Sequence, residues 1–520
     1  MRAAMTEQHP IMHRLAALPR LLAFAVAVGA GALGALGFEP VGSIAGPVLG
    51  LALLLLLLAA RPRGQAFALG LGFGFGNFLL GLTWIATAFS FQSAMPVWMG
   101  WVAVAGLSLF LALYIGLAAL IARRLAARLV PLSLIFAGLF ALAEIGRGLL
   151  FTGFAWNPMG AGWLQLPGVA QLAALVGANG LSALAVIAGG SLAALVAARG
   201  EAGRLPLILA FPLLLGIGLG VPRIQKPLPP PTGAKLLLVQ TGVGIADKHQ
   251  DGGLQRNVEA AVLRTRLALS GGLKPDLVIW PEATVEYPLE ELPDLRRELV
   301  AGLPEQASLM TGGVALWRDA DGTITAAANS AYLLDSRGGI RARYDKAHLV
   351  PGGEYLPLRA IAEPLGLARL VPGALDFRPG DGPVTWRFPP LPGIAPNICY
   401  EIIFPGAIVD RADRPDLIIT ISNDAWFGPS GPPQHHAQAR LRAIEEGLPV
   451  ARVTPTGLSG LIDPRGGLVE TLPRGVAAHA LVAAPAPLKP TPFARLGLLA
   501  PALFALLLVG LGLMLNRKRT

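Results

Sequence analysis

The apolar segments of this chain constrain its fold more than any other feature of its sequence. The first 221 residues consist almost entirely of such segments, each close to the roughly 20 residues that an α-helix needs to cross a bilayer. Charged residues make up 14% of the chain, against about a quarter in soluble proteins. The pattern therefore predicts an integral membrane protein. The predicted spans are 19–37, 43–60, 65–88, 97–122, 131–151, 168–198, 205–221 and 493–515.

The number of spans depends on the break at Phe38-Glu39-Pro40, which either separates two spans or kinks a single one. With two spans, about seven form a transmembrane helical domain over residues 1–221, and 493–515 adds a C-terminal transmembrane helix. The third span carries a glycine at every second position from 70 to 76, which predicts close packing of its helix against a neighbour. These glycines are Gly70, Gly72, Gly74 and Gly76.

Basic residues are concentrated in alternate connections between the spans, whereas the connection from Phe91 to Pro96 carries none. Basic connections stay in the cytoplasm, so both termini are predicted inside and the large polar region outside. Seven spans before that region agree with this orientation, and six would contradict it. The net charge of +10 lies mostly beside the spans, so we expect no nucleic-acid partner. The basic residues are Arg14, Arg20, Arg61, Arg63, Arg123, Arg124, Arg128, Arg199, Arg204, Arg517, Lys518 and Arg519.

Three other features bear on the membrane half and its ends. The basic N-terminus leads into an apolar segment without a small-residue cleavage site, which predicts a retained anchor. The chain has one cysteine, Cys399, which excludes an intrachain disulfide. Glu144 and Arg147 lie about one helical turn apart near the end of the fifth span. They either form an intrahelical pair, hold a lipid headgroup or brace the polar domain.

Residues 234–487 have the polarity of a globular domain and alternate β-rich runs with helical stretches. This order predicts a layered α/β domain with a central sheet. Pro-rich segments at 222–233 and 484–492 connect it to the spans. The predicted strands are 235–240, 276–280, 394–399 and 416–422, and the predicted helices are 257–269 and 436–446.

Groups with catalytic chemistry lie at three strand ends: Glu282 in a Trp-Pro-Glu sequence at the end of 276–280, Lys346 in a Tyr-Asp-Lys sequence that follows another strand, and Cys399 at the end of 394–399. A thiol attacks as the thiolate and needs a base near neutral pH, and Glu282 is the candidate. Lys346 can hold an oxyanion. Together they predict covalent acyl transfer. Each residue alone has an ordinary alternative, since a lone cysteine is more often a small buried hydrophobic residue.

Histidines raise the question of a metal site. His348 follows the lysine, and His435 and His436 are adjacent. There is no second cysteine and no ligand spacing typical of zinc, so we expect no metal and no cofactor.

The sequences WPE, YDK followed by HLVPGGEY, and CYE resemble the nitrilase superfamily in their order and spacing. FTGF and WNP in the membrane half, YDKAHLVPGGEYLP, CYEIIFP and SNDAWFG resemble the apolipoprotein N-acyltransferases. This resemblance covers nearly the whole chain, including the spans on both sides of the polar domain. It implies an αββα sandwich with a Glu–Lys–Cys triad on a polytopic helical membrane domain.

The resemblance also implies a role for each matching residue. Glu282 becomes the base, Lys346 the oxyanion stabiliser and Cys399 the nucleophile. The remaining matches are supporting residues: the second glutamate near the lysine, the polar residue on the preceding strand, the pair after the cysteine, and the tryptophan of SNDAWFG. In that order they are Glu354, Asn329, Tyr400, Glu401 and Trp426.

Some of these supporting roles have alternatives. The Tyr400 amide can complete an oxyanion hole, whereas Glu401 either assists the site or braces the following turn. Trp426 is either a site residue or part of the core. Where the family commonly has a tryptophan, this chain has His249, so that role is not transferred.

By the same resemblance, the expected activity is ping-pong transfer of an acyl chain in the bacterial inner membrane, with the catalytic domain on the periplasmic side. The donor is a phospholipid, the acceptor is the N-terminal diacylglyceryl-cysteine of an apolipoprotein, and the enzyme is expected to be a monomer. Two rival hypotheses remain: a membrane-tethered amidase for small amides or nitriles, and a transporter with a degenerate nitrilase domain. The second rival predicts charges deep in several spans, and these spans have almost none.

Overall fold

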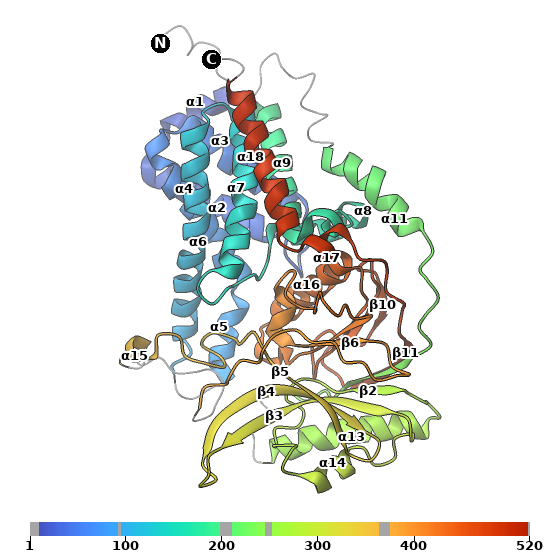
Figure 1. Cartoon of the computed structure of the whole chain (residues 1–520). Coiled ribbons are helices and arrows are strands. Elements are labelled where there is room, and N and C mark those ends of the chain that lie inside the picture. The colour runs from blue at the N-terminus through green and yellow to red at the C-terminus, as the bar shows by residue number, and fades with distance from the viewer. Residues whose placement is uncertain are drawn as a thin grey trace. The chain divides into compact units, whose positions relative to one another are not determined.

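A computed structural model describes residues 10–91, 95–197, 211–244, 252–362, 364 and 375–517. The chain divides into two compact units (Figure 1). The first comprises Met1–Trp84, Trp101–Pro227 and Thr491–Thr520, and the second comprises Ile85–Gly100 and Leu228–Pro490.

The first unit is built from apolar helices. Among the residues that the structure describes, four helices are long and apolar enough to cross a membrane, and two bent helix pairs bring the number to as many as six. Each predicted span overlaps one of these helices, one of the bent pairs or a shorter apolar helix. Residues 205–210 of the predicted span 205–221 lie outside the described residues, and the number of crossings stays a prediction. The helices of this unit and the segment that leaves it are α1 (Pro10–Ala17), α2 (Arg20–Ala35), α3 (Ala45–Ala60), η2 (Arg63–Gln65), α4 (Ala66–Gly81), α5 (Trp84–Ala88), η3 (Phe89–Phe91), α6 (Met99–Leu125), α7 (Leu129–Leu149), η4 (Met159–Gln165), α8 (Pro167–Ala170), α9 (Ala173–Ala197), η5 (Gly216–Gly220), α11 (Val221–Gln225), α17 (Pro492–Leu496) and α18 (Leu499–Arg517).

The break at Phe38-Glu39-Pro40 separates two helices that pack against each other. Helix α2 ends at Ala35 and α3 begins at Ala45. A Cβ atom on Gly50 of α3 would lie 2.2 Å from the carbonyl oxygen of Ala30 in α2. The break therefore reverses the chain between neighbouring helices and does not kink one long helix.

The glycines of α4 confirm the prediction of close helix packing. A Cβ atom on Gly76 would lie 2.0 Å from the carbonyl oxygen of Val28 in α2, and one on Gly31 of α2 would lie 1.9 Å from that of Phe73 in α4. Real Cβ atoms do not tolerate such distances, so the two backbones approach this closely only because glycine stands at both positions.

Glu144 and Arg147 of α7 are both buried and organise the loop that follows their helix. Arg147 donates hydrogen bonds to the carbonyl oxygens of Phe154, Trp156 and Asn157. Glu144 accepts one from the Met159 amide at 2.8 Å. Their charged atoms lie 3.8 Å apart. The pair thus satisfies loop backbone groups inside the first unit.

The second unit contains two sheets. The six-stranded sheet has the order β11-β1-β2-β3-β4-β5, and the five-stranded sheet has the order β10-β9-β8-β7-β6. Strands β1, β2 and β3 are parallel, as are β6, β7 and β8, and the other pairs are antiparallel. The strands are β1 (Lys235–Gln240), β2 (Leu277–Ile279), β3 (Ser308–Arg318), β4 (Ile324–Asp335), β5 (Ile340–Asp345), β6 (Ile394–Ile398), β7 (Leu417–Ile421), β8 (Val450–Val453), β9 (Gly460–Ile462), β10 (Leu468–Thr471) and β11 (Ala478–Ala483).

The two sheets pack face to face, because alternate residues of each strand point to opposite sides. In β1, Leu236 and Leu238 join an apolar core with Ile419 of β7 from the other sheet. Leu237 and Val239 of the same strand face a second core that includes Ala261 of α13. Figure 1 shows α13 and α14 along the outer side of the six-stranded sheet. The remaining elements are α13 (Gly253–Ser270), α14 (Pro293–Leu299), α15 (Arg359–Ala362), η7 (Cys399–Ile403), η8 (Asp424–Trp426) and α16 (Gly431–Glu446).

Helix α16 packs against β8 and β9 of the five-stranded sheet, which completes the αββα order of layers. The family resemblance implied this order. The separate prediction of one central sheet is wrong, because the strands distribute between two sheets. The predicted helices at 257–269 and 436–446 also begin earlier, at Gly253 and Gly431.

Candidate active site

Glu282, Lys346 and Cys399 each lie just beyond the end of a strand. Glu282 follows β2, Lys346 follows β5 and Cys399 follows β6. All three are buried, with relative exposures of 7%, 1% and 6%. The Lys346 Nζ atom lies 3.5 Å from Glu282 Oε1, and both charges act on the Cys399 thiol. The structure thus brings together three residues that are far apart in the sequence.

A glycine on the neighbouring strand permits the position of Glu282. A Cβ atom on Gly312 of β3 would lie 2.8 Å from the Cα atom of Glu282 and 2.5 Å from the amide nitrogen of Ala283. The Gly312 amide donates to the carbonyl oxygen of Pro281, and its carbonyl accepts from the Val285 amide. The Glu282 loop therefore lies directly against β3, which any larger residue would push away.

Lys346 is held between two carboxylates. Its Nζ atom donates to Glu354 Oε1 at 3.0 Å and lies 3.5 Å from Glu282. Burial alone would lower the pKa of Lys346, but the charges of Glu354 and Glu282 outweigh it and raise the pKa. The ammonium therefore keeps its charge at neutral pH in an enclosed site, where a cation stabilises a developing oxyanion most strongly.

Asn329 of β4 connects the two carboxylates. Its Nδ2 atom donates to Oε1 of Glu282 and to Oε1 of Glu354, both at 2.8 Å. An amide NH₂ group has two N–H bonds, so each carboxylate receives one. The Lys346 amide also donates to the Asn329 carbonyl oxygen at 2.9 Å. Asn329 thus fixes the lysine and both glutamates relative to β4.

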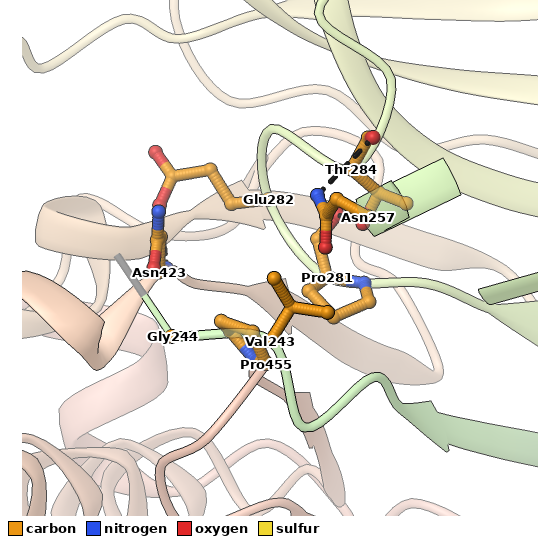
Figure 2. Close-up of a pocket in the computed structure, with 8 residues that line it drawn as sticks. All are labelled: Val243, Gly244, Asn257, Pro281, Glu282, Thr284, Asn423 and Pro455. Carbon is orange, nitrogen blue, oxygen red and sulfur yellow. Dashed lines mark hydrogen bonds between the residues drawn. The ribbon is translucent and has the colours of Figure 1, made fainter. Parts of the chain in front are cut away.

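The second oxygen of Glu282 accepts a hydrogen bond from the Asn423 backbone amide at 2.7 Å. Figure 2 shows Glu282 and Asn423 next to each other on the wall of a small pocket with about 220 Å³ of unfilled space. Its other lining residues are Val243, Gly244, Asn257, Pro281, Thr284 and Pro455. The candidate base therefore lies on the wall of this pocket.

Cys399 has an unusual backbone conformation. Its φ angle is +51°, in the left-handed region that residues other than glycine rarely adopt. Such strain persists where surrounding contacts impose it, and it is concentrated at functional sites. Burial and the Glu282 charge raise the pKa of the thiol, and Lys346 only partly offsets them. The resting thiol is therefore protonated at neutral pH, and attack requires a base.

Glu401 ties the strand of the cysteine to the loop of the lysine. Its Oε1 atom accepts hydrogen bonds from the Tyr344 hydroxyl at 2.6 Å, the Ala347 amide at 2.8 Å and the His348 amide at 3.2 Å. Its Oε2 atom accepts from the Ile398 amide at 2.7 Å. Tyr344 precedes Lys346 in the sequence, Ala347 and His348 follow it, and Ile398 is the last residue of β6. Glu401 therefore braces the site as well as the turn that follows the cysteine.

We expect Glu401→Gln to destabilise the protein by about 3 kcal/mol, because the new NH₂ group faces buried N–H donors that lose their acceptor. This corresponds to a drop of roughly 5 °C or more in the melting temperature. Thermal unfolding of the purified protein in detergent measures it. Glu305→Gln, at an ion pair that is 83% exposed, is the control and should melt like the wild type. Equal melting temperatures for all three proteins would contradict the bracing role.

The two aromatic candidates lie in different surroundings. Tyr400 is buried, and its ring makes an edge-on contact with Phe404 at 5.1 Å between centroids. Trp426 is half-buried, and its ring meets that of Phe91 edge-on at 6.1 Å. Trp426 is therefore not simple core. His249 lies outside the described residues.

The sequence motifs do not predict every polar residue of this region. Asn423 and Asp424 lie in SNDAWFG, of which only the tryptophan is a predicted site residue, and His435 is considered from the sequence only as a metal ligand. The adjacent polar residues at the end of β7 were the available signal, since they follow a buried strand as the other site residues do.

Two family models match the chain. The model of the apolipoprotein N-acyltransferase N-terminal domain matches residues 30–191, and that of carbon-nitrogen hydrolase matches residues 243–480. Among solved structures, an amidase from Nesterenkonia sp. is similar, with 17% identity, a TM-score of 0.35 and coverage of 50% of this chain and 93% of that one. The fold and the family models define a class of protein: a nitrilase-fold enzyme joined to apolar membrane helices.

Relatives define the family within that class. The apolipoprotein N-acyltransferase of Allorhizobium ampelinum is 37% identical over 483 residues, which cover 89% of this chain and 90% of the relative. That of Bradyrhizobium diazoefficiens is 36% identical over 419 residues, covering 77% and 76%. That of Rhodopseudomonas palustris is 34% identical over 465 residues, covering 85% and 84%. The chain belongs to the apolipoprotein N-acyltransferase family.

Proposed function

We propose that this protein transfers an acyl chain from a membrane phospholipid, through a thioester on Cys399, to the α-amino group of the diacylglyceryl-cysteine of an apolipoprotein. The observation that carries the proposal is the buried group of Glu282, Lys346 and Cys399, in which both charges act on the thiol. Membership of the apolipoprotein N-acyltransferase family supports the choice of acceptor. The apolar helices support a lipid donor.

In the first half-reaction, Glu282 accepts the thiol proton as the sulfur attacks the sn-1 ester carbonyl. The raised pKa of the thiol makes this transfer necessary, because little thiolate exists beforehand. Lys346 and the Tyr400 amide stabilise the tetrahedral oxyanion. Glu282 then gives the proton to the departing alkoxide, and a lysophospholipid leaves the acyl-enzyme.

In the second half-reaction, the α-amino group of the apolipoprotein attacks the thioester. Glu282 accepts a proton from the amine, and the proton returns to sulfur as the thiolate leaves. The product is an amide, which makes the transfer effectively irreversible. Glu354 and Asn329 hold Lys346 and Glu282 in place through both halves.

The membrane half brings two water-insoluble substrates to one enzyme. We assign residues 1–221 and 493–515 to the membrane, 222–233 to a linker and 234–487 to the catalytic domain. Both termini lie in the cytoplasm and the catalytic domain lies on the periplasmic side of the inner membrane, in keeping with the basic connections. A single chain supplies every residue of the proposed site, so a monomer suffices.

The test uses the full-length protein in vesicles that contain a phospholipid radiolabelled in its sn-1 chain. Without an acceptor, the protein should gain label that hydroxylamine removes, as it does from a thioester. Adding a diacylglyceryl-cysteine peptide should move the label to the peptide as a hydroxylamine-stable amide. A peptide with an acetylated N-terminus is the control and should receive none.

Two results would overturn the proposal. One is an unlabelled protein under conditions in which the peptide is acylated, which would exclude an acyl-enzyme. The other is release of the label as free fatty acid at a rate that the acceptor does not change, which would indicate a hydrolase.

A further inference from the structure

A second buried polar cluster lies behind the cysteine. Its members are Asp424, His435 and Arg452, which are at most 1% exposed. Asp424 Oδ2 accepts a hydrogen bond from Arg452 Nη2 at 2.6 Å, and Asp424 Oδ1 lies 3.1 Å from His435 Nδ1. The other ring nitrogen, His435 Nε2, lies 3.0 Å from the carbonyl oxygen of Cys399. No step of the proposed reaction uses this cluster.

The contacts determine which ring nitrogen of His435 carries the proton. The Cys399 carbonyl oxygen can only accept, so Nε2 must donate to it. Burial lowers the pKa of His435 and keeps the ring neutral at neutral pH. Nδ1 is then free to accept from Arg452 Nη2 at 2.9 Å. Arg452 is itself held in place, because it also donates to the Leu458 carbonyl oxygen at 2.7 Å. The His435 ring is therefore held at Nε2 by the Cys399 carbonyl and at Nδ1 by Arg452.

The contact with the Cys399 carbonyl has a geometric consequence for the next residue. A peptide unit is planar and trans, so its N–H points opposite to its C=O. Holding the Cys399 carbonyl oxygen therefore also fixes the direction of the Tyr400 N–H. The left-handed φ of Cys399 gives this peptide an orientation that the chain would not adopt without such a contact.

We propose that His435 is a positioning residue that orients the Cys399–Tyr400 peptide so that the Tyr400 N–H faces the oxyanion of the acyl-transfer reaction. The inference rests on the proposed function, because it needs a tetrahedral oxyanion at Cys399. His435 acts through the backbone and touches no reacting atom. Arg452 holds the ring at Nδ1. Asp424 holds Arg452, and Ser422 supports Asp424 by donating a hydrogen bond of 2.7 Å.

Two reactions of the same thiol separate this role from a general structural one. Acylation by phospholipid passes through an oxyanion, whereas alkylation by iodoacetamide displaces iodide from carbon and forms none. Loss of one oxyanion donor slows acyl transfer by about 10²- to 10³-fold. A variant that misorients the Tyr400 amide should therefore lose acylation and keep alkylation.

The informative pair of variants is His435→Asn and His435→Gln. The amide of asparagine matches the position of Nδ1, so it loses the donor to Cys399, whereas the longer glutamine matches Nε2 and retains it. We expect His435→Asn to acylate about 100-fold more slowly, and His435→Gln to recover most of that loss. Alkylation should stay within about threefold of the wild type in both variants. His436→Asn is the matched control and should acylate like the wild type, because His436 is also buried on α16 but the hydrogen bond to the Cys399 carbonyl oxygen comes from His435.

Each outcome decides the matter. Equal losses of acylation and alkylation in His435→Asn would show that the thiol itself has moved, and unchanged acylation would show that the contact has no role; either overturns the inference. If His435→Asn does not fold, Arg452→Lys replaces it, with a smaller expected loss of acylation and again no loss of alkylation. A wild-type protein that takes no acyl label at all would instead refute the proposed function.

Discussion

Cys399→Ser is expected to form no acyl-enzyme and to slow the overall transfer by about 10⁴-fold or more. Removal of the nucleophile from the catalytic group of a serine hydrolase has an effect of this size or larger. The serine hydroxyl is a far weaker acid than the thiol, and burial beside Glu282 opposes its ionisation further. Transfer to a diacylglyceryl-cysteine peptide, followed by mass spectrometry, measures the rate.

The chain offers a clear background for this measurement. Cys399 is its single cysteine, so the serine variant contains no thiol that could hold a thioester. Serine and cysteine have similar volumes, and the variant should melt within a few degrees of the wild type. A variant that retains more than a tenth of the wild-type rate would show that Cys399 is not the nucleophile.

Lys346→Met is expected to have the second-largest effect, a loss of about 10³-fold or more in the rate of Cys399 acylation. The Lys346 ammonium forms ion pairs with Glu282 and Glu354 inside the site. A preorganised cation stabilises the oxyanion of the transition state most strongly where water is excluded. Its removal also leaves two buried carboxylates without a cation, which costs about 3 to 5 kcal/mol of stability. Acylation rate and melting temperature should therefore fall together.

The pH dependence of this effect follows from the direction of the pKa shift. The pKa of Lys346 is raised, so its charge and the stability that depends on it are fully present below the ordinary lysine value. They are lost only as pH rises through the higher folded value. The deficit of the methionine variant should therefore persist between about pH 6 and pH 9.

Two further variants interpret the Lys346→Met result. Lys346→Arg keeps the charge and should restore most of the melting temperature. Its planar guanidinium replaces the compact ammonium, however, so acylation should stay about 10²-fold below the wild type. Lys274→Met, at an exposed lysine of the same domain, is the control and should leave both quantities unchanged. Full acylation by Lys346→Met would contradict the role of the lysine.

The parts that the sequence predicted well are those encoded locally. An apolar run reveals a helix that can cross a membrane, because its length and composition suffice. Likewise Glu282, Lys346 and Cys399 could be singled out because each carries reactive chemistry just after a β-rich run. The single central sheet was wrong for a non-local reason. Strands β6 and β7 are buried throughout and show no alternation of apolar and polar residues, so nothing within either strand indicates which sheet it will join.

The sequence by itself indicated a membrane protein with a catalytic domain and singled out Glu282, Lys346 and Cys399 as the candidates for its chemistry. Only the tertiary structure decided how they are held. Asn423 reaches Glu282 across 141 residues of sequence, Glu401 reaches the Ala347 amide across 54, and His435 reaches the Cys399 carbonyl across 36. Such contacts depend on where backbone amides and carbonyls come to lie. Every residue except proline carries both groups, so no side-chain pattern predicts these contacts, and only folding brings the partners within hydrogen-bonding distance.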